Sequence, residues 1–295
     1  MKKTLVLFFL LLSIINFYGQ NNSEGTEDVQ LLEENEIIDS ILEEESEEEF
    51  LKSVTKFQFI HLSIEYNNKT YFSGRDIGTD QFNISPQITY LHSNGLYFGL
   101  EGVYYDEFAP EWDYTSATIG YGKSFGKNKQ YRWETSYDRY FYTNTSGNNP
   151  FKNALSFTIE VDNKKKTFGT EVATTYLFGS DNSLQIVSST YGILNLLKKK
   201  HYHLKLQPQL NIVLAEQTIQ LSQTFTIRGV QFTRYVQNND FGLINTQLQI
   251  PLQYSTGNVD FELGYIFNFP TALEGETNLK TTGFFNFSMS YLFDL

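Results

Sequence analysis

The last fourteen residues of the chain, from Thr282 to Leu295, constrain its fold more than any other segment. From Phe285 onward apolar and polar side chains alternate, and only Leu292 interrupts the polar row. That polar row comprises Asn286, Ser288, Ser290 and Asp294. Successive side chains of a strand point to opposite faces, so one face of this segment is apolar along its whole length. The pattern predicts the closing strand of an outer-membrane β-barrel, apolar outside and polar inside.

The amino end of the chain predicts export. Lys2 and Lys3 precede an apolar run over residues 5–17. This run is too short to cross a hydrocarbon core about 30 Å thick, but it has the length of a secretory signal. We therefore expect residues 1–20 to be a signal peptide that is removed. The chain contains no cysteine, which excludes disulfides and a lipid-modified amino-terminal cysteine.

Negative charge is concentrated between residues 24 and 49. This stretch contains thirteen carboxylates and no Lys or Arg, whereas the whole chain has a net charge of −12, so the remainder is nearly neutral. Apolar residues recur in it at roughly helical spacing, at Val29, Leu32, Ile37, Ile38, Ile41 and Leu42. We interpret residues 21–53 as an acidic periplasmic segment, partly helical or disordered. A docking helix for a periplasmic partner, or a plug, is the alternative.

From about residue 54 the chain becomes rich in aromatic residues and alternates in polarity, with turn residues at regular intervals. The pattern predicts twelve antiparallel strands and a barrel over residues 54–295. The predicted strands are 54–66, 82–91, 96–106, 113–124, 130–142, 152–161, 166–178, 184–195, 201–214, 240–254, 258–269 and 282–294. Residues 217–227 also alternate, so fourteen strands is the alternative.

The lengths of the connections support a membrane barrel. Those after even-numbered strands are short, at residues 92–95, 125–129, 162–165, 196–200 and 255–257. Most of those after odd-numbered strands are longer, notably 67–81, 215–239 and 270–281. Short periplasmic turns opposite long outer loops are typical of outer-membrane barrels, and an even strand count places both termini in the periplasm.

A soluble β-sandwich is the rival fold, because it alternates too. Along residues 201–214 one face carries Tyr202 and Leu204, and the other carries His203 and Lys205. A sandwich could expose that polar face to water, but strands of ten or more residues favour a tilted, closed sheet.

Three strings extend the argument: GRDIGTDQFNISPQITYLHSNGLYFG at 74–99, NTQLQIPLQYSTGNVDFELGYIFNFP at 245–270 and FFNFSMSYLF at 284–293. With the acidic segment ahead of the first strand, they resemble a group of uncharacterised outer-membrane β-barrel proteins of Bacteroidota. The resemblance covers residues from about 24 to 295 and implies a barrel of this size. It brings no activity or catalytic residues with it.

The strongest catalytic candidate is His92 with Ser93, because outer-membrane phospholipase A uses a similar cluster of His, Ser, Asn and Gly. In that enzyme one residue separates the His from the Ser, so both side chains share a face of the strand. Here they are adjacent and would point to opposite faces. The string also continues with Asn94 and Gly95, an ordinary hairpin turn. We therefore predict no catalytic residues.

Two further sets of residues suggest binding. Arg75, between Gly74 and Asp76, could bind a ligand or a lipopolysaccharide phosphate. We favour the alternative interpretation, in which Arg75 forms an ion pair that closes the turn. His201 and His203 share a strand face, but no third metal ligand is identifiable. The sequence shows no phosphate-binding loop, zinc spacing or nucleic-acid module.

Alternation also predicts which charges line the lumen. These candidate residues are Glu65, Glu101, Arg132, Glu134, Asp138, Lys152, Glu160, Glu171, Lys205, Asp260 and Glu262. Such a set suits either a lumen packed with salt bridges or a passage that favours cations.

We therefore expect a narrow passive channel or a structural barrel without enzymatic activity and without a cofactor or metal. A membrane-embedded lipid hydrolase and an anchor for a periplasmic partner are the alternatives. The expected partners are outer-membrane lipids and lipopolysaccharide, the barrel assembly machinery through the C-terminal strand, and a periplasmic protein that binds residues 24–49.

Overall fold

The computed structural model describes residues 58–295 except 109, 127, 144–148, 217–220, 228–229, 237–240, 273–275 and 277–278. The expected signal peptide and acidic segment lie outside the described residues. In the described part of the chain, no helix is long and apolar enough to cross a membrane.

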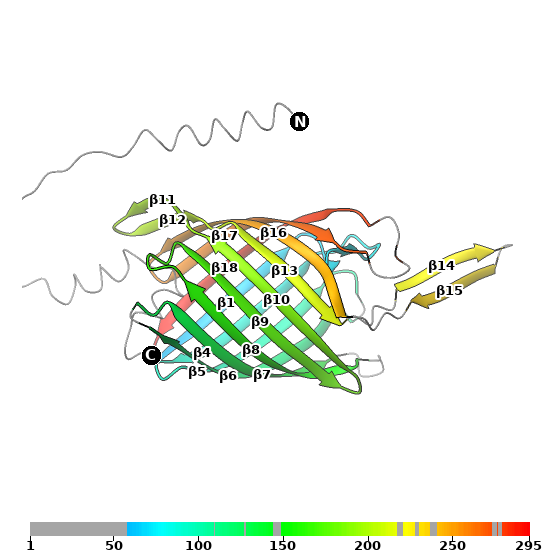
Figure 1. The fold of residues 1–295 in the computed structure, drawn as a ribbon, viewed down its shortest axis with the longest axis horizontal. Coiled ribbons are helices and arrows are strands. Elements are labelled where there is room, and N and C mark those ends of the chain that lie inside the picture. Colours follow the sequence, from blue (N-terminus) through cyan, green and yellow to red (C-terminus); the bar gives the residue numbers. More distant parts are fainter. Residues whose placement is uncertain are drawn as a thin grey trace, which may run out of the picture. The chain divides into compact units, whose positions relative to one another are not determined.

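Twelve antiparallel strands form a closed barrel (Figure 1). In chain order they are β1 (Gln58–Asn67), β4 (Asn83–His92), β5 (Leu96–Tyr105), β6 (Trp112–Phe125), β7 (Tyr131–Tyr142), β8 (Phe151–Asp162), β9 (Phe168–Gly179), β10 (Asn182–Gly192), β13 (Gln209–Glu216), β16 (Phe241–Thr256), β17 (Val259–Pro270) and β18 (Thr282–Asp294). Each pairs with the next strand of this set, and β18 pairs with β1 to close the circuit. The predicted count of twelve strands is confirmed.

The closing strand is the predicted one. Ser288 of β18 lies opposite Glu65 of β1 on one side and opposite Glu262 of β17 on the other. Polar residues of three strands therefore share one face, as the alternation of β18 requires.

One hairpin of the barrel extends beyond its neighbours. β10 continues after a break at Ile193 as β11 (Leu194–Lys199), and β13 is preceded by β12 (Tyr202–Leu206), which pairs with both β11 and β16. The break between β12 and β13 falls at Pro208, which has no N–H to donate to a ladder. Its carbonyl still accepts a hydrogen bond from Gly192 N, at 3.0 Å.

The predicted alternative of fourteen barrel strands is wrong. Two further strands, β14 (Leu221–Ile227) and β15 (Val230–Val236), pair only with each other. The flanking strands β13 and β16 pair directly, from Gln209 opposite Gln249 to Glu216 opposite Phe241. Because that ladder is complete, the circuit has no place for an additional pair of strands.

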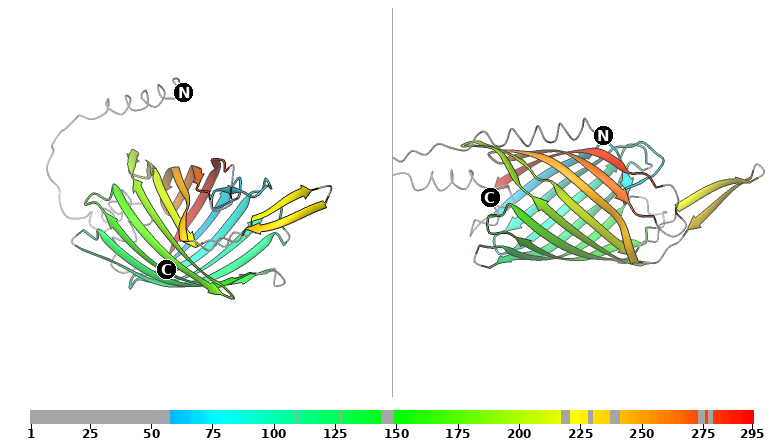
Figure 2. Two further views of the ribbon diagram at one scale, coloured as in Figure 1. Left: turned by 45° about the vertical axis from the view of Figure 1, so that its right-hand side comes forward. Right: turned by 45° about the horizontal axis from the view of Figure 1, so that its top comes forward.

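The strands run round the barrel at a tilt (Figure 2). The outer face is apolar, whereas buried polar side chains gather on the inner face. Large apolar side chains stay exposed at alternate positions, for example Leu155, Phe157 and Ile159 of β8. A soluble protein does not leave so large a continuous apolar surface in water, so the soluble sandwich is rejected. The exposed belt suits hydrocarbon.

The two ends of the barrel differ. At one end the connections are short, at residues 93–95, 126–130, 163–167, 200–201 and 257–258; we call this the short-turn end. At the other, which we call the long-loop end, lie residues 68–82, 106–111, 143–150, 180–181, 217–240 and 271–281. The first of these long loops contains the small hairpin of β2 (Tyr71–Phe72) and β3 (Arg75–Asp76).

Candidate functional site

The inner wall of the barrel is the candidate site. Its side chains are mostly polar, whereas the apolar side chains lie on the outer face of the same strands. One row of cross-strand partners crosses several strands as Arg132, Glu160, Glu171, Ser189, Asn211, Gln247, Asn268 and Thr282. A closed sheet brings such residues together although they come from distant parts of the chain.

Arg132 and Glu134 form an ion pair inside the barrel, near the short-turn end. Arg132 Nη2 donates to Glu134 Oε2 at 2.6 Å, and the two side chains are 32% and 27% exposed. The Tyr97 hydroxyl donates to the other carboxylate oxygen, Glu134 Oε1, at 2.5 Å. Glu134 is therefore held from two sides.

A second tyrosine holds the next two carboxylates. The Tyr191 hydroxyl lies 2.8 Å from Glu160 Oε1 and 2.6 Å from Asp162 Oδ1. A single phenol carries one proton, so it donates to one of these carboxylates at a time. Glu160 also lies directly across from Arg132 in register. Arg132 thus offsets part of the negative charge at this level of the wall, and the tyrosine hydroxyls stabilise the carboxylates by hydrogen bonding.

Sequence reasoning missed Asp162, Tyr97 and Tyr191. The two tyrosines stand opposite glycines, Tyr97 across from Gly120 and Tyr191 across from Gly169. A Cβ at Gly120 would lie 2.1 Å from Tyr97 Cζ, so each ring occupies the space that its glycine leaves. The pairing of an inward tyrosine with a cross-strand glycine was the signal, but it is visible only once the register is known.

Toward the long-loop end, Glu65 is fixed by amides. Asn67 Nδ2 and Asn286 Nδ2 each donate to Glu65 Oε1 at 2.9 Å. Asn67 also donates to Asn83 Oδ1 at 3.0 Å, and Asn83 donates to Thr70 Oγ1 at 2.8 Å. The network links the inner wall to the first long loop.

The remaining predicted carboxylates are spread over the same wall. Glu262 accepts a hydrogen bond from Gln253, and Asp138 accepts one from Thr118 at 2.6 Å. Glu101 lies between Gln87 and Ser116 in register. Asp260 is paired with Ser255 and Ser290, and Glu171 with Glu160 and Ser189.

The predicted basic residues fall in different places. Lys205 is buried on β12, opposite Gln253, and His203 on the same strand contacts Asn195 Oδ1 through Nε2 at 2.9 Å. Lys152 is exposed at the irregularity where the register shifts between Phe151 and Asn153. The described residues contain no group of three or more His, Asp or Glu side chains arranged to hold a metal ion.

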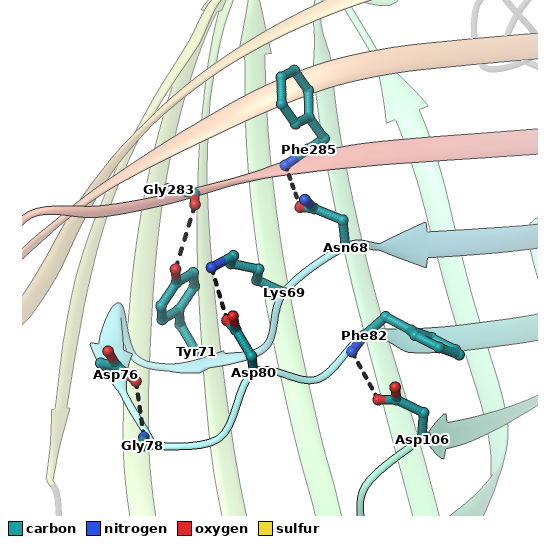
Figure 3. Close-up of polar contacts among 10 residues, drawn as sticks. All are labelled: Asn68, Lys69, Tyr71, Asp76, Gly78, Asp80, Phe82, Asp106, Gly283 and Phe285. Atoms are coloured by element: carbon teal, nitrogen blue, oxygen red, sulfur yellow. Dashed lines mark hydrogen bonds and ion pairs between the residues drawn. The ribbon is translucent and has the colours of Figure 1, made fainter.

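The first long loop folds inward at the mouth of the barrel. The Tyr71 hydroxyl donates to Gly283 O at 3.5 Å, and Phe285 N donates to Asn68 Oδ1 at 2.7 Å (Figure 3). The Thr282 hydroxyl donates to Gly74 O at 2.7 Å, and Gly74, at φ +78°, lies against the Asn245 side chain. Since Thr282 and Asn245 belong to the inner wall, the loop rests on that wall.

Arg75 fixes this loop. Its guanidinium donates to both carboxylate oxygens of Glu276, at 2.8 and 3.0 Å, and to the carbonyls of Ile244 and Thr271, at 3.2 and 2.7 Å. The expected ion pair therefore exists, but it joins two loops rather than closing one turn. Asp76 instead accepts from Gly78 N at 2.8 Å (Figure 3).

Other contacts of the loop are weaker or incomplete. Lys69 Nζ contacts Asp80 Oδ1 at 2.7 Å, and this hydrogen bond raises the pKa of the Lys69 amino group (Figure 3). Burial raises the pKa of the Tyr71 hydroxyl. Within the described residues, neither amide atom of Gln81 has a hydrogen-bond partner, nor has Asn245 Oδ1. Each buried, unpaired group costs about 1–3 kcal/mol, which opposes the inward packing.

His92 is the last residue of β4, and Ser93 begins the hairpin turn to β5, so the predicted turn starts one residue later than expected. Asn94 N donates to His92 Nδ1 at 3.0 Å, and Gly95, at φ +98°, donates from its N to His92 O at 2.9 Å. In a neutral imidazole the nitrogen that accepts is the one without a proton. The turn therefore uses the nitrogen that would act as a base, which disfavours a catalytic role.

No protein-family model matches the chain, and no curated protein matches its sequence. Among solved structures, the chain is similar to the KdgM porin, with 7% identity over 79% of this chain and 98% of that chain and a TM-score of 0.43. It is also similar to an outer-membrane channel from Pseudomonas putida F1, with 11% identity, 82% and 98% coverage and a TM-score of 0.47. LpxR from Salmonella typhimurium shows 10% identity, 79% and 100% coverage and a TM-score of 0.45. Function must therefore be argued from this chain's own residues.

Proposed function

We propose that the protein is a narrow passive channel of the outer membrane that favours cations and has no enzymatic activity. The observation that carries this is the composition of the inner wall. Its carboxylates are Glu65, Glu101, Glu134, Asp138, Glu160, Asp162, Glu171, Asp260 and Glu262, against Arg132 and Lys205. An excess of carboxylates lowers the barrier to cation entry.

The dimensions support a narrow path. Twelve strands enclose more than the eight-stranded barrels that side chains fill, and less than general porins of 16 to 18 strands. The first long loop also rests on the inner wall at the mouth, which reduces the opening further.

We further propose that both termini lie in the periplasm, with the short-turn end on that side. The exterior would contact outer-membrane lipids and lipopolysaccharide. The barrel assembly machinery would bind the C-terminal strand β18. We also propose that the chain belongs to the uncharacterised outer-membrane β-barrel proteins of Bacteroidota that its sequence resembles.

The test is ion conduction in a planar bilayer. We expect small single-channel steps with a cation preference that Glu101→Gln reduces, because Glu101 is a lumen carboxylate flanked by neutral Gln87 and Ser116. Glu107→Gln, the same change in an exposed loop, is the matched control. Large anion-selective steps would contradict the proposal.

A sealed structural barrel is the second candidate, and the paired groups Arg132, Glu134 and Tyr97 favour it. In that case the folded protein would show no conduction in the same bilayer experiment. If the protein hydrolysed phospholipids and the Ser93→Ala variant did not, the result would instead support the alternative function, a membrane-embedded lipid hydrolase.

A further inference from the structure

The hairpin of β11 and β12 leaves the closed part of the barrel at the short-turn end (Figure 1). β9 and β10 stay paired up to Phe168 opposite Gly192, and Ile193 N then donates to Thr167 O at 2.8 Å. Beyond that point β11 pairs with β12, and its other edge pairs with no strand of the described residues. β12 remains joined to β16, so the hairpin has one attached edge and one free edge.

The outer face of this hairpin is apolar. Leu194 lies opposite Leu206, and Leu197 lies opposite Leu204, so these four leucines share one face. On β16 the same face continues with Leu252, which lies opposite Leu206 and is exposed. The leucines of the hairpin therefore extend the exposed apolar belt of the barrel.

A bulge in β11 adds a leucine to this face. Asn195 is paired with Lys205, and the pairing then passes over Leu196 and resumes at Leu197. Leu196 points outward because it follows the inward Asn195, and the extra residue of the bulge returns Leu197 to the same side. Leu194, Leu196 and Leu197 are 51%, 48% and 39% exposed. Three leucines within four residues thus face outward.

The inner face of the hairpin is polar. His203 Nε2 contacts Asn195 Oδ1 at 2.9 Å, and the buried Lys205 lies opposite Gln253 of β16. The hairpin therefore keeps the two faces of the barrel wall, although β11 has separated from β9.

The tip of the hairpin carries residues typical of a membrane interface. Lys199 lies opposite Tyr202 on the outer face. The Tyr202 ring contacts the Tyr254 ring, with centroids 6.0 Å apart, and Tyr254 contacts Phe261 at 6.5 Å. Tyrosine rings are enriched at the level of lipid headgroups, and a lysine near them extends its ammonium group toward the polar layer.

The free edge of β11 limits how deep the hairpin can lie. Backbone N–H and C=O groups on that edge have no strand partner among the described residues, and unsatisfied backbone groups are costly in hydrocarbon. Exposed leucines are unfavourable in water. Both demands are met at the boundary between headgroups and acyl chains, where water reaches the edge and hydrocarbon receives the leucines.

We propose that the β11–β12 hairpin lies on the phospholipid leaflet at the short-turn end. Leu194, Leu196 and Leu197 enter the acyl boundary, and the Lys199 ammonium binds phospholipid phosphate. An exposed edge strand can also pair with another chain. Lipid is favoured because the leucine face is continuous with the exposed apolar belt. The inference rests on the proposed contact between this belt and lipid, and it needs no conduction.

Depth-dependent fluorescence quenching tests this in the full-length protein, folded into phosphatidylcholine vesicles. Since the chain contains no cysteine, Leu196→Cys accepts a single fluorophore. Phe157→Cys, on the exposed outer face of β8, is the reference within lipid. Asn258→Cys, in the exposed turn between β16 and β17 at the same end, is the control in water. Phosphatidylcholines brominated at different depths quench the label, and heat-modifiable gel migration verifies folding.

We expect the Leu196 label to lie about 5–10 Å below the headgroup boundary. The Phe157 label should lie deeper, and the Asn258 label should not be quenched. Adding Lys199→Gln should weaken quenching of the Leu196 label by about twofold, the effect of losing one exposed ion pair. Unchanged quenching in that variant would refute the phosphate contact.

Two further results would overturn the proposal at different levels. If the Phe157 label escapes quenching, the apolar belt itself does not contact lipid, and the proposed membrane exterior fails with the hairpin. If the Phe157 label is quenched and the Leu196 label is not, only the placement of the hairpin is wrong. Disulfide-linked dimers of Leu196→Cys under mild oxidation would then assign the free edge to a second copy of the chain.

Discussion

Arg75 and Glu276 are joined by two hydrogen bonds, 2.8 and 3.0 Å long, across 201 residues of sequence. Each side chain is only 4% exposed. The same guanidinium donates to Thr271 O and Ile244 O, so one side chain holds the first long loop against the last one and against β16. Breaking a buried pair by removing one partner is costly, because a buried charge is left uncompensated.

Arg75→Ala should therefore release the first long loop while the barrel stays closed. We expect local opening to become easier by about 3 kcal/mol, seen as faster chymotrypsin cleavage at Tyr71 or Phe72. The double variant Arg75→Met, Glu276→Leu removes both charges and should be cleaved more slowly than Arg75→Ala. Equal cleavage of Arg75→Ala and the parent protein would show that the pair does not hold the loop.

Gly120→Ala should destabilise the barrel, because the added Cβ would lie 2.1 Å from Tyr97 Cζ. The ring must move, which breaks the hydrogen bond from Tyr97 to Glu134. We expect a loss of about 1–3 kcal/mol in urea unfolding, the usual range for overpacking. Gly192→Ala is the control, since its nearest neighbour, Thr167 O, is 4.0 Å away. Similar losses in both variants would argue against a steric role for Gly120.

The proposed orientation can be tested by cysteine labelling on intact cells. Single cysteines at Asp80 and Asp181, on the long-loop end, should react with an impermeant thiol reagent. Cysteines at Lys165 and Asn258, on the short-turn end, should react only after the outer membrane is opened. The reverse pattern would invert the barrel and place both termini outside.

Asp80→Asn should lower the pKa of the Lys69 amino group, since the hydrogen bond that Lys69 donates to Asp80 is the main cause of its elevation. A raised lysine pKa means that the pair stabilises the loop fully below pH 10.5, the ordinary value, and loses this effect as pH rises through the raised value. The rate of Lys69 acylation against pH measures the shift. Both side chains are well exposed, so barrel unfolding should not change. An unaltered acylation profile would contradict the assignment.

Alternation along single strands was enough to predict much of this fold. The period of two residues is a local property, so the apolar face of β18, the polar row of Glu65, Glu134 and Glu262, and the count of twelve strands could all be predicted from the chain. The same rule failed to indicate the irregularity beside Lys152, because a bulge inserts a residue without any marker in the pattern.

The local pattern of the chain was sufficient to predict a barrel with an apolar exterior, a polar inner face and a closing C-terminal strand. Three features became visible only in the folded protein: β14 and β15 pair outside the barrel, Tyr97 fills the space at Gly120, and Arg75 forms an ion pair with Glu276. These features depend on the register between strands and on contacts between loops. The loops come together only after β18 has paired with β1 and closed the barrel. Contacts between residues 201 positions apart leave no periodic trace in the chain.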